Sequence, residues 1–368
     1  MKTVLHVIDT TGPGGAETIF LQLAKKVAEN GHKSIALIRG NGWVQSQLEQ
    51  FNIPFYIIDC KGSFNLKYLL SLIKLIRTEK VDVIQSHLLG SSVYCSMAGI
   101  ITKTRVISTF HGMVDISPNE RFRKIKLMAL QLGCDKIVAV TDVLYKMICD
   151  LGTIKSTKIT TICNGIDINL YKKIETKEYR NKLNINDNEI LIGSLGNIRT
   201  PKNYSLAIKT IKEIHKQGWK VHYAIAGQGN DQQMAPLQQL ISELNLTDYV
   251  HILGFTKKTQ SFLSSIDIFL MSSSSEGHPL ALTQAMANAL PIVSTKSGVE
   301  LIAIDEKEAI ISSSMTPANL ASALISLLND NSLAKTIGQN AFDKAKEKFT
   351  LDAMFHTYFK LYVLPEDS

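Results

Sequence analysis

The sequence predicts an α/β protein made of two doubly wound parallel sheets in succession. Short apolar segments alternate with amphipathic helical segments along most of the 368 residues, a pattern typical of parallel sheets. The alternation lapses once, in the polar stretch Leu170–Asn188, and then starts again. A chain of this length can also form two domains of ordinary size. We therefore expect an N-terminal domain at residues 1–170 and a C-terminal domain at residues 185–349.

Seven apolar segments in the first half are expected to form strands. In chain order they are Val4–Asp9, Lys33–Ile38, Pro54–Ile58, Val81–Ser86, Arg105–Phe110, Lys136–Val140 and Ile159–Ile162. The start of the chain is too short and too soon polar for a secretory signal, so it is interpreted as the first strand. Helices are expected between the strands, for example at Ala16–Asn30, which Gly31 ends, and at Tyr68–Lys80.

Six further segments are expected to form the strands of the second sheet. They are Ile190–Gly196, Val221–Ala226, His251–Gly254, Asp267–Met271, Pro291–Ser294 and Ala309–Ile311. The helix after the first of them has clear boundaries, with Thr200 as N-cap, Pro201 at the first helical position and Gly218 as the stop. The aromatic-rich segment Thr350–Leu364 is expected to form a helix that packs back on the first domain.

Composition and cysteine spacing are typical of a globular protein in a reducing compartment. The hydrophobic fraction is 45%, the charged fraction is 20%, and no apolar run approaches the ~20 residues that span a bilayer. The cysteines are odd in number, widely spaced and without a C-x-x-C pair, so we expect free thiols and no zinc site. They are Cys60, Cys95, Cys134, Cys149 and Cys163. We expect a cytoplasmic protein that could lie peripherally at the inner face of the plasma membrane.

The net charge of +7 is spread unevenly along the chain. Residues 1–182 hold 25 Lys and Arg against 15 Asp and Glu, a net charge of +10; the totals of 40 and 33 leave 15 and 18 for the remainder, a net charge of −3. The basic half, and the mixed segment Arg121–Lys126 within it, could contact an anionic membrane. A solvated lysine-rich surface explains the same residues. Nucleic acid is not expected, because no binding motif is visible and the cations are not interleaved with aromatics.

The segment Ser272–Ala287 is the most informative of the chain. It reads S-S-S-S-E-G-H-P-L-A-L-T-Q-A-M-A, a polar loop that ends on Glu276 and Gly277 before Pro279 opens an Ala-rich helix. A helix N-terminus carries free N–H groups and partial positive charge that suit a diphosphate, and a carboxylate in front of it can accept hydrogen bonds from sugar hydroxyls. A loop and helix cap with no ligand is the alternative.

Lys202 and Arg199 are candidates for binding a diphosphate. Lys202 is expected in the first turn of a helix, directly after a strand, where the helix dipole disfavours a cation. An anionic ligand would compensate for this cost. Two solvated surface charges are the alternative.

Four other loops follow expected strands, and none is specific alone. Gly12–Glu17 is rich in glycine but carries Glu17 where a dinucleotide fingerprint needs its third glycine. His111, between Phe110 and Gly112, could hydrogen-bond a sugar or phosphate, although a lone histidine is more often structural. The remaining two are the tight loop Gly227–Gly229 and Leu253–Phe255, which could present an aromatic ring to a flat base.

These pieces in this order resemble a GT-B glycosyltransferase of the family 4 type, the "glycosyl transferases group 1" family. The resemblance covers nearly the whole chain. Its motifs are Gly14–Glu17, Phe110–Gly112, Asn164–Asp167, Gly196–Asn203, Gly227–Gly229, Leu253–Phe255 and the Glu276 loop. It implies a GT-B fold with two Rossmann-like domains facing across a cleft, and retaining transfer from a nucleoside-diphosphate sugar. It also implies a saccharide or polyprenyl-linked acceptor, in capsule or O-antigen biosynthesis.

The resemblance assigns roles position by position. Glu276 would contact the transferred sugar, Lys202 would bind the diphosphate, and His111 would sit by the sugar. The other implied substrate-binding positions are Gly14, Gly15, Asn197, Arg199, Gly227, Gly254, Phe255, Gly277, His278, Pro279, Leu280 and Gln284. No Asp-x-Asp pair is present, so neither a metal nor another cofactor is expected beyond the donor itself.

Two positions depart from the family pattern. The second acid of its Glu-x7-Glu motif is Gln284, which keeps one carbonyl acceptor for ribose but loses the charge. The usual arginine of the second-domain glycine loop is Asn197, and Arg199 could replace it. An active glycosyltransferase is still expected. A nucleotide-sugar epimerase and a catalytically weak sugar-nucleotide binding partner are the alternatives.

Overall fold

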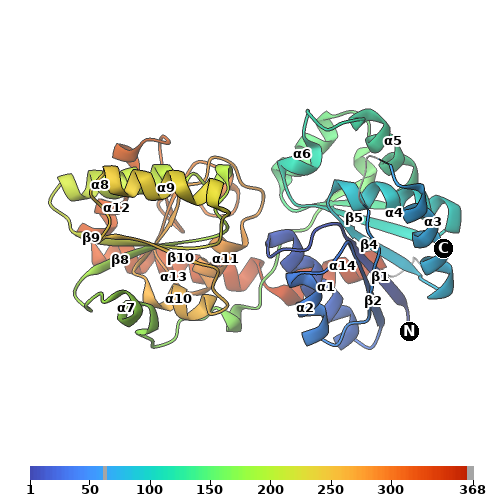
Figure 1. The fold of residues 1–368 in the computed structure, drawn as a ribbon, viewed down its shortest axis with the longest axis horizontal. Helices are drawn as coiled ribbons and strands as arrows, with labels where there is room; N and C mark the ends of the chain where they lie inside the picture. The colour runs from blue at the N-terminus through green and yellow to red at the C-terminus, as the bar shows by residue number, and fades with distance from the viewer. Residues whose placement is uncertain (61–63, 363–368) are drawn as a thin grey trace. The chain divides into compact units, whose positions relative to one another are not determined.

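The computed structural model describes residues 1–60 and 64–362, which divide into two compact units (Figure 1). Unit 1 comprises Met1–Gly165 together with the segment that begins at Leu351, and unit 2 comprises Ile166–Thr350. Each unit is built on a parallel sheet with helices on both of its faces. The expected α/β class with two doubly wound sheets is confirmed.

Unit 1 has a seven-stranded sheet in the order β3-β2-β1-β4-β5-β6-β7, and every neighbouring pair is parallel. Its strands are β1 Thr3–Ile8, β2 Lys33–Ile38, β3 Phe55–Ile57, β4 Val83–His87, β5 Arg105–Phe110, β6 Lys136–Ala139 and β7 Ile159–Thr161. All residues of β1 and β4 are buried, as expected for central strands that helices cover on both sides.

The helices of unit 1 form two layers. They are α1 Gly15–Glu29, α2 Trp43–Gln50, α3 Leu66–Thr78, α4 Leu89–Thr102, α5 Arg123–Gly133, α6 Asp142–Asp150 and α14 Leu351–Tyr362, with 3-10 turns η1 Met113–Ile116 and η2 Ser156–Lys158. Helices α3 to α6 cover one side of the sheet, and α1, α2 and α14 cover the other (Figure 1).

Unit 2 has a six-stranded parallel sheet in the order β10-β9-β8-β11-β12-β13. Its strands are β8 Ile190–Leu195, β9 Val221–Ala226, β10 Val250–Gly254, β11 Ile268–Met271, β12 Ile292–Thr295 and β13 Ile310–Ser312. Its helices are α7 Glu178–Leu183, α8 Tyr204–Lys216, α9 Asp231–Glu243, α10 Thr259–Ser265, α11 Leu280–Ala287, α12 Pro317–Asn329 and α13 Asn331–Lys348, with 3-10 turns η3 Ile168–Leu170, η4 Thr200–Lys202 and η5 Val299–Leu301. All thirteen expected strands are therefore present, with ends that shift by at most two residues.

The terminal helix α14 packs on unit 1 through its aromatic residues. The Tyr358 hydroxyl lies 2.9 Å from Thr109 Oγ1, and the Tyr362 hydroxyl donates to Gln85 Oε1 at 3.2 Å. Both tyrosines are buried. The last two residues of the expected helix, Val363 and Leu364, lie outside the described residues.

The expected connection at Leu170–Asn188 is wrong, because this stretch belongs to unit 2. It forms α7, whose Arg180 is buried and donates to the carbonyls of Ser265, Asn186 and Glu189 at 2.9 to 3.1 Å. Its Nη2 also lies 2.5 Å from Asp267 Oδ2. Because α7 is short and held by the polar contacts of Arg180, its sequence has no apolar periodicity, and the sequence analysis did not predict it as a helix.

The boundaries expected for the helix after β8 are also wrong at its start. Residues Thr200–Lys202 form the separate turn η4, and α8 begins at Tyr204. The break falls at Asn203, which adopts φ +47°, a left-handed conformation that asparagine tolerates. Lys202 therefore precedes the α-helix instead of lying in its first turn.

Removing the Arg180 side chain is expected to destabilise unit 2. Arg180→Ala leaves three carbonyl acceptors without their donor and should lower the free energy of unfolding by about 3 kcal/mol. Urea denaturation measures this change, with Lys173→Ala on the exposed surface of the same stretch as control, for which a change within about 0.5 kcal/mol is expected. Equal midpoints for the two variants would contradict the role assigned to Arg180.

Candidate active site

The charged residues expected to act in the second half lie at the switch point of its sheet. Strand β8 pairs with β9 on one side and with β11 on the other, so the connections leave in opposite directions from this point. Ligands of open parallel sheets bind outside the carboxyl ends of the strands at such a position. Lys202 follows β8 and Glu276 follows β11.

Lys202 and Glu276 form an ion pair there. Lys202 Nζ donates to Glu276 Oε1 at 2.7 Å, and Ser273 Oγ donates to the same oxygen at 2.5 Å. The two charged side chains are 22% and 13% exposed, so the pair is partly shielded from water but accessible from one side. The structure therefore brings together the two charged residues that the sequence predicts to contact the sugar and the diphosphate.

The backbone of the Glu276 loop is tied to the lysine turn and to the next strand. Ser272 Oγ donates to the Lys202 carbonyl at 2.9 Å, and Ser274 N donates to the Pro201 carbonyl at 2.8 Å. Glu276 N donates to the Ser297 carbonyl at 2.7 Å. The serine run thus fixes the carboxylate relative to three successive strand ends.

Two glycines are required where these loops touch. A Cβ atom on Gly227 would lie 1.8 Å from the Gly196 carbonyl oxygen, and one on Gly298 would lie 2.7 Å from the Glu276 carbonyl oxygen. Gly298 also adopts φ +106°. The loop after β9 therefore meets the loop after β8 at backbone distance, and the loop after β12 meets the loop after β11 in the same way.

The other expected residues of these loops line the same edge of the sheet. Gly227 is bridged to Gly254, and Phe255 after it is 42% exposed, so its ring is available to a ligand. Asn197 is half-buried, and Arg199 is exposed in the loop that leads to Lys202.

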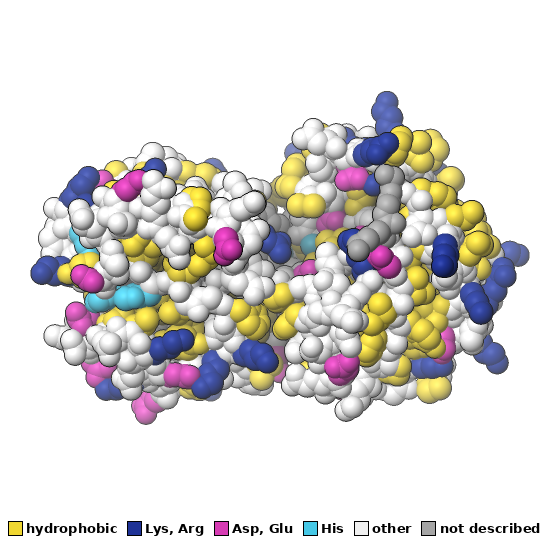
Figure 2. All heavy atoms as spheres, viewed as in Figure 1, with side chains coloured by type: hydrophobic (Ala, Val, Ile, Leu, Met, Phe, Trp, Pro, Cys, Tyr) yellow, Lys and Arg dark blue, Asp and Glu magenta, His cyan; other side chains and the backbone are white. Residues whose placement is uncertain are grey.

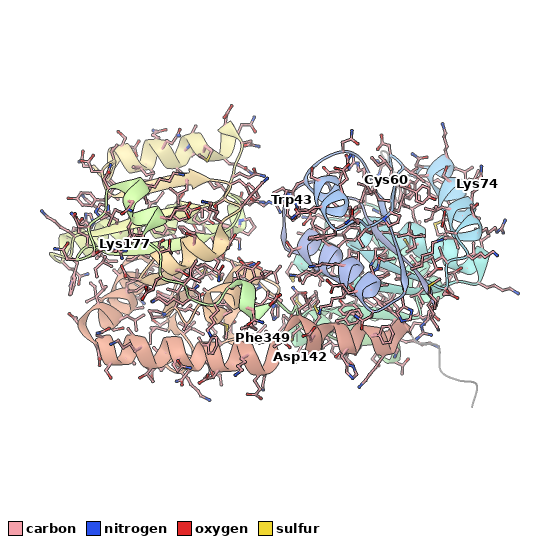
Figure 3. The ribbon with its side chains drawn as sticks, turned by 90° about the horizontal axis from the view of Figure 1, so that it is seen from below. Trp43, Cys60, Lys74, Asp142, Lys177 and Phe349 are labelled. Carbon is pink, nitrogen blue, oxygen red and sulfur yellow. The ribbon has the colours of Figure 1, made fainter. Side chains whose placement is uncertain are left out.

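The residues that open α11 are placed differently from one another. Gly277 is half-buried, whereas His278, Pro279 and Leu280 are buried. The His278 ring packs edge-on against Phe349, with ring centroids 5.2 Å apart, and burial lowers the pKa of His278 to about 4. Phe349 is labelled in Figure 3. The imidazole is therefore neutral at pH 7 and faces the interior of unit 2, so a ligand at this helix start would meet backbone groups.

Gln284 also points into unit 2. It is buried in α11, and its side chain hydrogen-bonds the Tyr171 hydroxyl. Tyr171 in turn accepts a bond from Asn288 Nδ2 at its carbonyl, at 2.8 Å. The amide thus joins α11 to the segment that enters the unit, a contact that the sequence did not predict.

In unit 1, His111 lies against a second histidine at the ends of neighbouring strands. His87 Nδ1 and His111 Nε2 are 3.0 Å apart, and the two rings stack with centroids 5.2 Å apart. Burial lowers the pKa of His111 to about 3, and burial with the neighbouring histidines lowers the pKa of His87. Both rings are therefore neutral, one nitrogen of the pair donating and the other accepting.

Asp115 organises the His111 loop. Its carboxylate accepts from His111 N at 2.7 Å and from Leu89 N, the first residue of α4, at 2.8 Å. Burial raises the pKa of Asp115 to about 6 despite these bonds, which act in the opposite direction. Sequence reasoning missed both His87 and Asp115. His87 ends β4 as His111 follows β5, and this parallel could have indicated the pair.

The glycine turn before α1 is shaped by Glu17. Gly14 is the N-cap of α1 and Gly15 is its first residue. A Cβ atom on Gly14 would lie 2.3 Å from Glu17 Oε2, so this position cannot carry a side chain while the buried glutamate stays in place. Gly15 is exposed at the helix start.

Two features are absent from the part of the chain that the structure describes. No group of three or more His, Cys, Asp or Glu side chains is arranged to hold a metal ion within residues 1–60 and 64–362. Within the same residues, no helix has both the length and the apolar character needed to cross a bilayer. All five cysteines are free thiols, and Cys95 and Cys134 are buried.

Two doubly wound units of this kind define the GT-B class of glycosyltransferases. The structure of HepE from Anabaena in complex with UDP-glucose superposes with a TM-score of 0.88, covering 98% of this chain and 99% of that chain at 20% identity. The family model described as Glycosyltransferase Family 4 matches residues 13–170, and that described as Glycosyl transferases group 1 matches residues 175–344. The chain belongs to this glycosyltransferase family and is a transferase.

Two glycosyltransferases of Escherichia coli are similar to this chain in sequence. The O-antigen biosynthesis glycosyltransferase WclY of Escherichia coli is 26% identical over 62% of this chain, and the match spans about 65% of the length of WclY. The UDP-Gal:alpha-D-GlcNAc-diphosphoundecaprenol alpha-1,3-galactosyltransferase of Escherichia coli is 23% identical over 87% of this chain and 85% of its own length.

Replacing His6 is expected to reduce the acid sensitivity of unit 1. His6 is fully buried against Phe20, has no hydrogen-bond partner among the described residues, and has its pKa lowered by burial to about 3. Because the unfolded chain takes up a proton near pH 6.5, wild-type stability is complete above that pH and is lost as the pH falls toward 3.

The variant His6→Leu removes this loss. Relative to the wild type, the free energy of unfolding of the variant should rise by about 1.4 kcal/mol for each pH unit below 6.5, which is about 2 kcal/mol at pH 5. Urea denaturation at pH 7, 6 and 5 measures the difference between the two proteins, in which the other titrating groups cancel. A constant difference across this range would contradict the assignment.

Proposed function

We propose that the protein is a retaining glycosyltransferase that moves a sugar from a nucleoside-diphosphate sugar to a saccharide or polyprenyl-linked acceptor. Its role would be in the biosynthesis of a bacterial surface polysaccharide, at the cytoplasmic side of the membrane. Support comes from the relatives, one named for O-antigen biosynthesis and one for a diphosphoundecaprenol acceptor, and from a structural neighbour that binds UDP-glucose.

The observation that carries this proposal is the pairing of Lys202 with Glu276 at the switch point of unit 2. The two groups are 2.7 Å apart, and each matches a different part of the proposed donor. The ammonium suits the diphosphate, and the carboxylate suits the hydroxyls of the sugar. A donor bound along Gly277–Leu280 would meet both, with the start of α11 adding backbone N–H groups for the phosphates.

In the proposed reaction the bond between the anomeric carbon and the diphosphate breaks, and the acceptor oxygen forms a bond to the same face of that carbon. Lys202 stabilises the negative charge on the departing diphosphate, and Arg199 is near enough in the chain to assist. The acceptor hydroxyl gives its proton to the departing diphosphate. The family resemblance assigns His111 of unit 1, whose ring is neutral and bonded to His87, a role at the sugar. We propose no metal for this step.

A two-stage experiment tests the proposal. A thermal-shift panel of nucleoside diphosphates and their sugars identifies the donor, since a ligand at 100 times its Kd stabilises the folded protein by about 2.7 kcal/mol. The donor is then mixed with a lipid and saccharide extract, in buffer with EDTA, and the new glycoside is examined by NMR. A product with the donor's anomeric configuration is expected.

Other outcomes would identify the alternative functions. Conversion of the donor to an epimer without a glycoside would indicate an epimerase. Donor binding with neither hydrolysis nor transfer would indicate a binding protein. A product of inverted configuration, or activity lost in EDTA, would contradict the retaining or the metal-independent part of the proposal.

Removal of the Lys202 charge is expected to abolish most of the transfer. Lys202→Met keeps the aliphatic stem over Gly196, where Lys202 Cε would lie 3.1 Å from an added Cβ, but removes the ammonium. The rate constant for transfer should fall by about 10² to 10³, because a preorganised group that stabilises the leaving charge is lost. Single-turnover kinetics measure the change.

Two control variants make this result specific. Lys209→Met, on the exposed face of α8, changes the same charge away from the site and should leave the rate unchanged. Lys202→Arg keeps the charge and should retain more activity than Lys202→Met. Wild-type transfer in a folded Lys202→Met protein would refute the assignment of Lys202.

A further inference from the structure

Asp115 is a buried carboxylate that joins two loops of unit 1. It lies in η1, is only 2% exposed, and accepts a backbone N–H with each of its two oxygens. Oδ2 accepts from His111 N, after β5, at 2.7 Å, and Oδ1 accepts from Leu89 N, after β4, at 2.8 Å. On the face shown in Figure 2, Asp and Glu side chains lie at the surface among Lys and Arg, as carboxylates usually do. The burial of Asp115 has a free-energy cost that a surface carboxylate does not have.

Other aspartates make the same kind of bond without being buried. Each accepts the N–H of a neighbouring strand: Asp82 from Thr3 N at 2.7 Å, and Asp135 from Val106 N and Asp267 from Leu191 N at 2.8 Å. These three side chains belong to exposed residues that lie directly before β4, β6 and β11. Joining strands therefore does not require a buried carboxylate. What Asp115 joins is the pair of loops that follow β4 and β5, next to His87 and His111.

The loop after β4 is held in a strained conformation. Leu88, between His87 and the first residue of α4, has φ +69° and ψ 157°, which a leucine rarely adopts. Such a conformation persists only where the surrounding contacts hold it. Leu88 N donates to the Thr109 carbonyl at 3.1 Å, and the next N–H along the chain is the one that Asp115 accepts. The carboxylate therefore holds His87 through this turn and His111 directly.

The two histidines leave one nitrogen on each ring without a partner. His87 Nδ1 lies 3.0 Å from His111 Nε2, whereas His87 Nε2 and His111 Nδ1 are buried and have no hydrogen-bond partner among residues 1–60 and 64–362. His87 is fully buried, but His111 is only half-buried. His111 Nδ1 is therefore a polar atom that a bound ligand could satisfy, and the contact with His87 sets its direction.

We propose that Asp115 is a positioning residue, whose carboxylate keeps His111 in place for transfer and releases it on taking up a proton. A protonated carboxyl has one good acceptor oxygen, and its other oxygen carries a donor, so it cannot hold both backbone N–H groups as the carboxylate does. The lost bond frees either the His111 backbone or the strained turn at Leu88, and both changes alter the contact between the rings. The inference rests on the proposed function only in placing His111 at the sugar.

The groups around Asp115 put this protonation in an accessible range of pH. Burial raises the pKa of Asp115 to about 6, against the effect of the N–H groups that it accepts. Asp9, at the end of β1, adds a like charge, and burial raises the pKa of Asp9 as well. His87 and His111 have lowered pKa values and stay neutral through this range. On the side of α5, Arg123 Nη2 donates to the carbonyl of the residue after Asp115 at 3.1 Å.

The same protonation separates activity from folding. The pKa of Asp115 in the folded protein is above its ordinary value of 3.8. The folded state therefore takes up this proton more readily than the unfolded chain, and between about pH 6 and 3.8 the group favours folding more as the pH falls. Transfer should nevertheless decline as the pH falls through about 6, since the His111 loop is released. We call this decline the acid limb.

Hydrogen exchange of the wild-type protein tests the release without any variant. The protection factor of the His111 amide, the Leu89 amide or both should fall by about tenfold or more between pH 7.5 and pH 5, because a bond to a charged acceptor is lost. The Val106 amide, which Asp135 accepts at the other end of β5, is the reference and should change little. Protection of both amides that does not depend on pH would overturn the proposal, whether or not the protein transfers a sugar.

The variant Asp115→Asn removes the charge and its titration together. At pH 8 the kcat for transfer should fall by about tenfold to 100-fold, and KM for the donor should change little, because the proposed donor-binding charges lie in unit 2. The acid limb should be absent, so that kcat no longer declines between pH 7 and pH 5. A folded Asp115→Asn protein with the wild-type kcat and acid limb would overturn the proposal.

Two control variants assign the acid limb to one carboxyl. Asp135→Asn loses the same kind of bond at the amino end of β5, and it should keep the kcat and the acid limb of the wild type. Asp9→Asn removes the neighbouring like charge and should move the acid limb to lower pH without abolishing it. Thermal melting checks that each variant is folded. An acid limb that is lost in Asp9→Asn and kept in Asp115→Asn would assign the titration to Asp9 and would overturn the proposal.

Discussion

The contact of backbone with backbone at the carboxyl ends of β8, β9, β11 and β12 determines the geometry of unit 2. Gly227 touches the Gly196 carbonyl, and Gly298 touches the Glu276 carbonyl, at distances that exclude any side chain. Ser272 Oγ donates to the Lys202 carbonyl and so ties the loop after β11 to the loop after β8, where the Lys202 ammonium lies beside the Glu276 carboxylate. An ion pair on free loops would contribute little and would not hold its position. Here the hydrogen bonds of the backbone fix it, so both groups are already oriented for a ligand.

The strands and the class of the fold were predictable from the sequence because each strand is a short apolar run between turn residues. The same reasoning failed where polar side chains build structure. Arg180 organises α7 through three carbonyls and one carboxylate, which leaves no periodic apolar signal. Asn203 adopts a left-handed conformation that separates the Lys202 turn from α8, and the neighbouring residues give no signal from which this break could be predicted. With the boundary at Ile166, unit 1 has a net charge of +6 (21 basic and 15 acidic) and unit 2 one of +1 (19 and 18), so the expected contrast in charge is smaller.

The candidate site was predictable only where a residue lies in a recognisable loop. Glu276, Lys202 and His111 each follow a strand, and the rules of parallel sheets place such residues at one edge. His87 was missed because its partner is 24 positions away in the chain and adjacent only across β4 and β5. The pair also shows how burial acts on the site. Because the pKa of each imidazole is lowered, both rings are neutral at pH 7; their contact is a hydrogen bond between neutral rings, and its direction fixes the tautomer of His111.

The charge of the unit 2 site gives a physical reason for the glutamine at position 284. Lys202 and Glu276 together are neutral, so a diphosphate would add negative charge that Arg199 and the start of α11 must offset. Gln284 is buried and bonded to the Tyr171 hydroxyl. A carboxylate at that position would carry a desolvation cost and a further negative charge on α11, whose start we propose to face the phosphates. The neutral amide avoids both, and it keeps α11 attached to the entering segment through a hydrogen bond that requires no counterion.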